Sequence, residues 1–349
     1  GETSSTDSDT DNDTLKDGEE DRNGNGVLDA NESNPLSVDS DGDGINDNIE
    51  DLNGDKNPSN DNTDGDSLIN ARDNDDDGDG IDTIIEGDET VNTDGTDNPD
   101  YRDTDSDNDG LLDENEDQNG DGLLDSNESS RILRDTDGDG VEDDHEDTNG
   151  NGDPSDDDSD GDLIIDAQDT DDDGDGIDTI IEGDETVNTD GTDNPDYRDT
   201  DSDNDGLLDA NEDQDGNGTM DVNETSRILI DSDGDGITDF LEDVNGNGDP
   251  TDDNTDGDAL INGRDTDDDG DTILTSTEGG VLDTDADSVL NYLDNDDDGD
   301  SILTKDEDVD SSGDVTDDDS DGDGQVDYLD EDDDNDGVNT RYEVAASPV

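Results

Sequence analysis

The sequence contains no cysteine and no tryptophan, and aromatic residues make up only 2% of it. Without cysteine, disulfide bonds cannot hold the chain together. Hydrophobic residues amount to 20%. That is too little apolar surface to offset the roughly 1–2 kcal/mol of backbone entropy lost for each ordered residue. A conventional hydrophobic core is therefore excluded, and composition alone would predict a disordered acidic tract.

Basic residues are scarce as well, with 12 Lys and Arg against 124 Asp and Glu and a formal net charge of −112. Such a charge repels nucleic acid and anionic membrane surfaces, so we expect neither as a partner. No apolar run approaches the roughly 20 residues that span a bilayer, so we expect no membrane insertion. No signal peptide is visible and the chain opens on Gly1, which fits a processed exported polypeptide or a fragment.

What the sequence has in abundance is aspartate at every second position, closed by glycine. Asp39, Asp41 and Asp43 precede Gly44, and Glu50 follows six residues later. Calcium takes 6–8 oxygen ligands in flexible geometry, which a chain can supply by presenting alternate side chains, turning sharply and returning with a carboxylate. Glycine makes the turn without a Cβ penalty. Zinc and copper fit poorly, because the chain has one histidine and no cysteine.

This twelve-residue pattern, with Asp or Asn at positions 1, 3 and 5 and Asp or Glu at position 12, recurs nineteen times. We expect each copy to bind one or more Ca²⁺ ions, and we expect binding to drive folding because the ligands of an empty loop repel one another. The candidate metal ligands, including an acid at position 9 in some loops, are Asp9, Asp11, Asp13 and Glu20; Asp21, Asn23, Asn25 and Glu32; Asp39, Asp41, Asp43, Asp47 and Glu50; Asn62, Asp64, Asp66 and Asp73; Asp75, Asp77, Asp79 and Glu86; Asp105, Asp107, Asp109, Asp113 and Glu116; Asp117, Asn119, Asp121, Asp125 and Glu128; Asp135, Asp137, Asp139, Asp143 and Glu146; Asp158, Asp160, Asp162 and Asp169; Asp171, Asp173, Asp175 and Glu182; Asp201, Asp203, Asp205, Asp209 and Glu212; Asp213, Asp215, Asn217, Asp221 and Glu224; Asp231, Asp233, Asp235, Asp239 and Glu242; Asn254, Asp256, Asp258 and Asp265; Asp267, Asp269, Asp271 and Glu278; Asp283, Asp285, Asp287 and Asp294; Asp296, Asp298, Asp300 and Glu307; Asp319, Asp321, Asp323 and Asp330; and Asp332, Asp334, Asp336 and Glu343.

A second, longer repeat contains these loops. Residues 75–113 and 171–209 are identical, a step of 96 residues. We therefore divide the chain into a partial first copy (1–74), two full copies (75–170 and 171–266) and a diverged C-terminal part with paired loops (267–349). Such an array predicts units that chiefly contact their neighbours in sequence.

The position of the apolar residue inside each loop indicates which known type of calcium-binding repeat the chain resembles. This residue stands at position 7, as in Ile45, Ile81 and Val141, whereas helix-flanked EF-hand and dockerin loops carry it at position 8. A DxDxDGhxxxxD/E unit repeated without helices resembles the thrombospondin type 3 repeat, in particular the cysteine-free versions of bacterial surface proteins. The resemblance covers essentially the whole chain and implies a chain wound around a string of calcium ions that form its core. The departure is the missing cysteine near the loop end, where Ile49 or Leu241 stands.

The predicted fold is irregular and mostly coil, with tandem calcium-wrapped DxDxDG loops forming an elongated, metal-cored solenoid or rod with little helix or strand. Apolar pairs such as Leu111/Leu112 and Leu123/Leu124 are expected to bury against pairs in the next loop. Each buried Leu would contribute roughly 1.5–3 kcal/mol, enough to help set register but not to fold the chain alone.

No nucleophile has a candidate histidine partner and no phosphate loop carries its lysine, so we expect no enzyme. We expect an extracellular or cell-surface structural protein that self-associates, as the subunit of a filament or fibre, or the stalk of an adhesin. The alternative is a calcium reservoir, or an acidic protein that interacts with mineral or ice. Sequons at Asn12, Asn31, Asn127, Asn217 and Asn223 would allow covalent glycans, or they arise by chance in an Asn- and Thr-rich chain.

Overall fold

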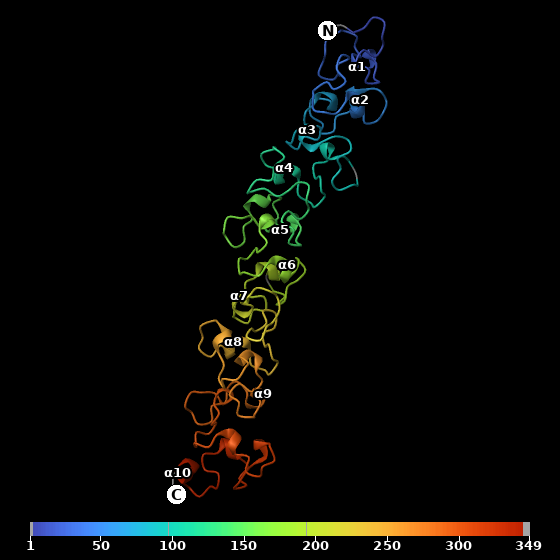
Figure 1. The fold of residues 1–349 in the computed structure, drawn as a ribbon. Helices are drawn as coiled ribbons and strands as arrows, with labels where there is room; N and C mark the ends of the chain where they lie inside the picture. The colour runs from blue at the N-terminus through green and yellow to red at the C-terminus, as the bar shows by residue number, and fades with distance from the viewer. Residues whose placement is uncertain (1–2, 97, 193, 345–349) are drawn as a thin grey trace. The chain divides into compact units, whose positions relative to one another are not determined.

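The structure is a computed structural model that describes residues 3–96, 98–192 and 194–344, apart from the side chains of residues 343 and 344. The chain divides into two compact units, residues 1–172 (unit 1) and 173–349 (unit 2). Both units are built from the same kind of loop, and most of these loops end in a short helical turn (Figure 1).

The described residues contain no strand, and most of them lie in turns and bends. The α-helical turns are α1 Asp17–Glu20, α2 Asp47–Glu50, α3 Thr83–Glu86, α4 Asp113–Glu116, α5 Asp143–Glu146, α6 Thr179–Glu182, α7 Asp209–Glu212, α8 Asp239–Glu242, α9 Thr275–Glu278 and α10 Thr340–Val344. The 3₁₀ turns are η1 Pro58–Asn60, η2 Asn70–Arg72, η3 Asp100–Arg102, η4 Pro154–Asp156, η5 Asp166–Gln168, η6 Asp196–Arg198, η7 Pro250–Asp252, η8 Asn262–Arg264, η9 Asn291–Leu293, η10 Thr304–Asp306, η11 Val315–Asp317 and η12 Asp327–Leu329. The prediction of an irregular, mostly coil fold with little helix is confirmed over this part of the chain.

The helical turns occupy positions 9–12 of the loops. In the loop 39–50, the backbone N–H of Asp47 donates to the carbonyl of Val38 (3.0 Å), which closes the loop at its base. The turn α2 starts at Asp47 and ends at Glu50, whose side chain is fully buried. One helical turn is therefore what carries the position-12 acid from the loop surface to its interior.

The front half of the loop is shaped by two residues in the left-handed region. Gly42 and Gly44, at positions 4 and 6, have φ of 88° and 107°. Their backbone N–H groups donate to the two carboxylate oxygens of Asp39, at 2.6 and 3.3 Å. The glycine expected at position 6 thus has the conformational role assigned to it.

Apolar burial is limited to small contacts. The position-7 residue is buried in nine of the nineteen loops, as in Ile45 (2% exposed) and Ile81 (0%). Leu111 is 3% exposed but its neighbour Leu112 is 40% exposed, so one member of that pair is buried. The prediction that Leu123 and Leu124 are buried is wrong: these side chains are 65% and 53% exposed, because the apolar residues of this loop point toward solvent.

Three side chains, spaced 96 residues apart in the chain, hydrogen-bond to the backbone of loops that precede them by 40 to 43 residues. Arg72, Gln168 and Arg264 occupy equivalent positions of the repeat, and each donates to two backbone carbonyl oxygens 40 and 43 residues earlier. Each brace holds the end of a preceding loop by protein groups alone. Within the described residues, no helix has the length and apolar character needed to cross a bilayer.

Candidate metal centres

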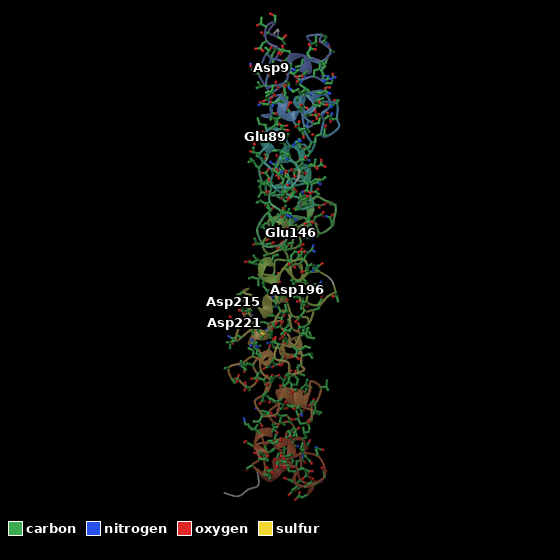
Figure 2. All side chains as sticks on the ribbon, turned by 90° about the vertical axis from the view of Figure 1, so that its right-hand side faces the viewer. Asp9, Glu89, Glu146, Asp196, Asp215 and Asp221 are labelled. Carbon is green, nitrogen blue, oxygen red and sulfur yellow. The ribbon has the colours of Figure 1, made fainter. Side chains whose placement is uncertain are left out.

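Thirteen loops end in a buried glutamate at position 12. In ten of them burial raises the pKa of that glutamate to about 8 or higher, and we call these ten the core loops: 9–20, 39–50, 75–86, 105–116, 135–146, 171–182, 201–212, 231–242, 267–278 and 296–307. None of these ten glutamates is more than 8% exposed. Side-chain oxygens accompany the chain throughout both units (Figure 2). In the core loops they also point inward, which a chain with no ligand would avoid because buried charge is costly.

Each core loop satisfies only part of its own carboxylates. In 39–50, Asp41 Oδ1 accepts from the N–H of Asp43 (3.3 Å), and Asp43 Oδ1 accepts from the N–H of Ile45 (2.8 Å). The Oδ2 atoms of both aspartates and both oxygens of Glu50 are buried without a hydrogen-bond partner. Buried polar atoms are almost always paired in proteins, so these four oxygens indicate a ligand that accepts electron pairs.

The side chains of different loops converge into clusters. In unit 2, Asp269, Asp271, Glu278 and Asp297 are all buried, and one carboxylate oxygen from each lies within 4.8 Å of the others. Equivalent clusters are Asp298, Asp300, Glu307 and Asp333 in unit 2, and Asp13, Glu20 and Asp47 in unit 1. A set of convergent carboxylates with no nitrogen or sulfur donor fits a hard cation such as Ca²⁺.

The electrostatics agree with this geometry. Burial raises the pKa of Glu50 to about 11, and the charges of Asp76 and Asp41 add to the shift. Burial likewise raises the pKa of Glu278 to about 10, with further contributions from Asp271 and Asp269. Without a cation these groups would hold protons, and a bound divalent ion would keep them ionised instead.

Two clusters contain an arginine. Arg131 Nη1 lies 3.8 Å from Glu86 Oε1 and 3.8 Å from Asp113 Oδ2 in unit 1. In unit 2, Arg227 Nη1 lies 3.3 Å from Glu182 Oε1. These guanidinium groups offset part of the negative charge, so these two centres depend less on a metal ion than those without arginine.

Three predicted loops, 21–32, 117–128 and 213–224, lack a buried carboxylate cluster of this kind. Asn replaces Asp at position 3 or 5, and the position-12 acid is satisfied by the protein itself. Glu32, for example, accepts from the N–H groups of Asn23 (3.2 Å) and Asp29 (3.4 Å). These loops close by hydrogen bonds.

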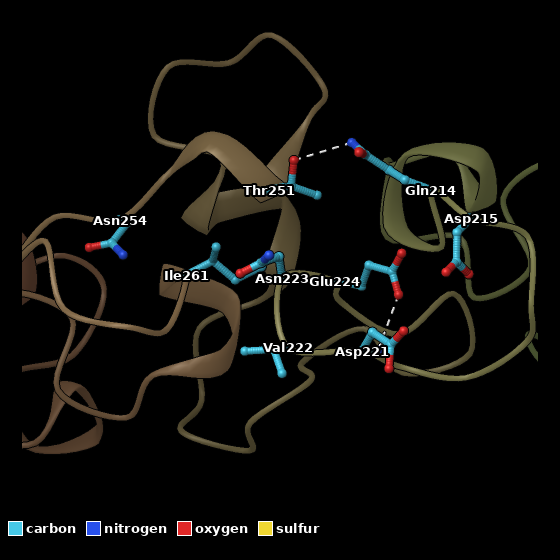
Figure 3. A pocket seen from close by; sticks show the side chains of 9 residues that line it. All are labelled: Gln214, Asp215, Asp221, Val222, Asn223, Glu224, Thr251, Asn254 and Ile261. Carbon is cyan, nitrogen blue, oxygen red and sulfur yellow. Dashed lines mark hydrogen bonds between the residues drawn. The ribbon is translucent and has the colours of Figure 1, made fainter.

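Figure 3 shows the third of these loops beside a recess of about 860 Å³ in unit 2. Glu224 Oε2 accepts from the N–H of Asp221 (3.1 Å), and Gln214 Nε2 donates to Thr251 Oγ1 (3.2 Å). The recess is lined by polar and acidic side chains together with Val222 and Ile261. The convergent, unpartnered carboxylates lie elsewhere.

Five further loops end in aspartate: 62–73, 158–169, 254–265, 283–294 and 319–330. Their position-12 side chains are half-buried, while positions 3 and 5, such as Asp64 and Asp66, are at least partly exposed. Burial, with the charge of Asp66 adding to it, raises the pKa of Asp73. In the last loop, 332–343, the side chain of Glu343 lies outside the described residues.

The sequence pattern missed one set of acids. These acids stand at position 2, where the template asks for no particular residue: Asp76, Asp172, Asp268, Asp297 and Asp333. The first four are fully buried and Asp333 is half-buried. Each lies near the position-12 glutamate of the preceding core loop. The available signal was a run of three aspartates at positions 1–3, in place of the Asp-Ser-Asp or Asp-Thr-Asp of other core loops.

Comparison of the chain with protein-family models gives no match, and comparison with curated proteins gives none either. The resemblance to thrombospondin type 3 repeats therefore rests on motif spacing, and the function is argued from the site itself.

Proposed function

We propose that this protein is a calcium-dependent structural protein of the cell exterior, whose loops fold around Ca²⁺ ions as a metal-cored solenoid. The observation that carries the proposal is the buried cluster of Asp269, Asp271, Glu278 and Asp297, where four carboxylates converge and both oxygens of Glu278 have no hydrogen-bond partner. Such a centre is unfavourable without a cation and favourable with one.

The number and type of ligands support calcium. The clusters are all carboxylate and draw on irregular loops, which can adjust to the 6–8 ligands of Ca²⁺ more readily than to the strict octahedron of Mg²⁺. Extracellular calcium modules work with dissociation constants of roughly 10⁻⁴–10⁻³ M. A chain that relies on many such sites is suited to an environment in which calcium is always plentiful, and this supports a location outside the cell.

A structural role follows from the repetition. A buried glutamate with further acids around it recurs in ten core loops, whereas a catalytic site is a single constellation. We propose that the protein serves as a filament or fibre subunit, or as an adhesin stalk, and that it self-associates. The high negative charge opposes lateral association unless bound calcium neutralises it, so assembly is expected only in calcium.

The experiment that tests this function is removal of calcium from the full chain. Excess EDTA is expected to abolish the ordered circular dichroism signal and to increase the radius of gyration measured by small-angle X-ray scattering, and added CaCl₂ is expected to reverse both. A chain that stays compact in chelator would refute the proposal. Electron microscopy in millimolar calcium then separates the roles: filaments support self-association, whereas isolated particles that bind and release calcium without changing size would favour a reservoir.

A further inference from the structure

The clusters show which loop supplies the last carboxylate. Asp297 belongs to the core loop 296–307, yet it closes the cluster of the preceding core loop, 267–278. Asp333 in the same way closes the cluster of 296–307. In unit 1, Asp47 of the core loop 39–50 closes the cluster of 9–20. The closing acid therefore comes from the next loop of this series.

The closing acid stands at one of two positions. Asp297 and Asp333 are at position 2 of their loops, whereas Asp47 is at position 9. The same neighbour relations raise the pKa values of six of the seven other glutamates: Asp76 acts on Glu50, Asp113 on Glu86, Asp172 on Glu146, Asp209 on Glu182, Asp239 on Glu212 and Asp268 on Glu242. In the seventh core loop, 105–116, the next-loop acid Asp143 raises the pKa of Asp107 instead, after the larger effect of burial.

The residue types at positions 2 and 9 of a core loop are correlated: one position carries Asp and the other carries Ser or Thr. Where position 9 is Asp in a core loop, position 2 is Ser or Thr and its hydroxyl donates to the acid, as Ser40 Oγ does to Asp47 Oδ2 (2.6 Å). Where position 2 is Asp, position 9 is Thr, and the N–H of Asp297 donates to Thr304 Oγ1 (3.2 Å). No loop of the nineteen carries an acid at both positions.

Positions 2 and 9 both face the carboxylate cluster of the preceding core loop. The Thr304 hydroxyl, at position 9, also faces the carboxylate of Asp271 in the preceding core loop and partly offsets the rise that burial causes in the pKa of Asp271. Thr275 and Thr340 contact Asp235 and Asp300 in the same manner. A carboxylate placed at position 9 of these loops would therefore reach the cluster that position 2 now completes.

Independent of the acidic clustering, the oxygens in this place lack partners. Asp271 is 0% exposed and its Oδ2 has no hydrogen-bond partner. Both oxygens of Glu278 and Oδ1 of Asp297 are also buried without one. Four unpartnered oxygens aimed at one point, from two loops, indicate that a cation lies between the loops.

We propose that each core loop completes the divalent-cation site of the preceding core loop with one carboxylate, supplied interchangeably from position 2 or position 9. The proposal rests on the calcium-binding function proposed above and extends it. Each ion then bridges two loops about 30 residues apart. The ions hold successive loops to one another, and loss of one ion loosens the neighbouring loop.

The test uses terbium(III), which takes the oxygen ligands of calcium and luminesces when a nearby tyrosine is excited. The buried ring of Tyr328 lies beside Asp297, Glu278 and Asp271. The luminescence difference between each protein and its Tyr328→Phe version therefore reports this one centre in the full chain. The variants are Asp297→Ser, the exchange Asp297→Ser/Thr304→Asp, and the control Asp306→Asn, which removes an exposed carboxylate from the same loop.

Asp297→Ser is expected to weaken terbium binding at this centre by about tenfold or more, because loss of even an outer-shell partner costs 10–100-fold. The double exchange is expected to restore binding, and Asp306→Asn to leave it unchanged. An unaltered titration of Asp297→Ser, or failure of the exchange to restore binding, would overturn the inference.

A wild-type chain that binds neither terbium nor calcium would instead overturn the proposed function. If Asp297→Ser does not fold in saturating calcium, the reverse exchange decides: Ser40→Asp/Asp47→Thr should bind as many calcium ions as the wild type in equilibrium dialysis, and Asp47→Thr alone one fewer. Equal counts for these two variants would refute the inference as well.

Discussion

Arg264 Nη1 donates a hydrogen bond to the backbone carbonyl oxygen of Glu224, 40 residues earlier in the chain, at 2.9 Å. The same nitrogen donates to the carbonyl of Asp221 at 2.6 Å. This brace fixes the end of the loop 213–224, which closes by protein hydrogen bonds. Protein hydrogen bonds therefore hold some loops in place, in addition to the metal ions that we propose for the core loops.

Replacing Arg264 by Ala is expected to lower the free energy of unfolding of the calcium-bound protein by about 1.5–3 kcal/mol, the range for hydrogen bonds from charged groups. Arg264→Gln should retain most of the stability, because Gln168 makes the equivalent two bonds in the preceding repeat. Urea unfolding measures both, with the exposed Arg22→Ala as control. Equal losses for Ala and Gln would contradict this account of the brace.

Glu50→Gln should stabilise the compact chain in the absence of calcium and destabilise it in the presence of calcium. Both Glu50 oxygens are buried and unpartnered, so a neutral amide is expected to make the chelated chain more compact. In calcium the same change removes a ligand and should lower the thermal midpoint. The matched control is Glu32→Gln, whose acid is buried but accepts two backbone N–H groups, and for which no reversal of sign is expected.

Low pH should partly replace calcium in keeping the chain compact. The folded-state pKa of Glu50 (about 11) and of Glu278 (about 10) lie above the ordinary value of 4.5, mainly because burial disfavours the charged form. Their contribution to stability in the metal-free chain is therefore fully present below about pH 4.5 and is lost as pH rises through the folded-state values.

In EDTA, the radius of gyration is thus expected to be smaller at pH 5.5 than at pH 8. Measurements at pH 5.5 stay above the isoelectric point of about 4.1, where loss of net charge would promote precipitation. In calcium the trend should be opposite, since protons compete with the ion for the carboxylates. A metal-free chain equally expanded at both pH values would contradict the prediction.

Leu163→Gly is expected to stabilise the protein by about 1 kcal/mol. Leu163 stands at position 6 with φ of 85°, a conformation that costs a non-glycine residue roughly 1–2 kcal/mol, and its side chain is 87% exposed. The control Leu123→Gly removes a similarly exposed leucine (65%) that lies outside the left-handed region, so it should destabilise through backbone entropy alone. Chemical denaturation in saturating calcium compares the two.

The sequence alone determined the loop as the unit of structure. The spacing of Asp39, Asp41, Asp43 and Glu50 lies within twelve residues, and ligand spacing, glycine conformation and the helical turn at position 12 are all local properties of the chain. The lack of apolar residues likewise required something other than a hydrophobic core. These features could be predicted because no distant part of the chain is needed to specify them.

The tertiary structure decided which loops are buried and which acids meet. Glu32 and Glu50 match the same template, but one is held by backbone N–H groups while the other faces unpartnered carboxylates. Asp297 meets Glu278 from a different loop, at a position that the template ignores. Burial and the convergence of carboxylates depend on what the neighbouring loop places against a side chain, and that contact is made in space between residues far apart in the chain.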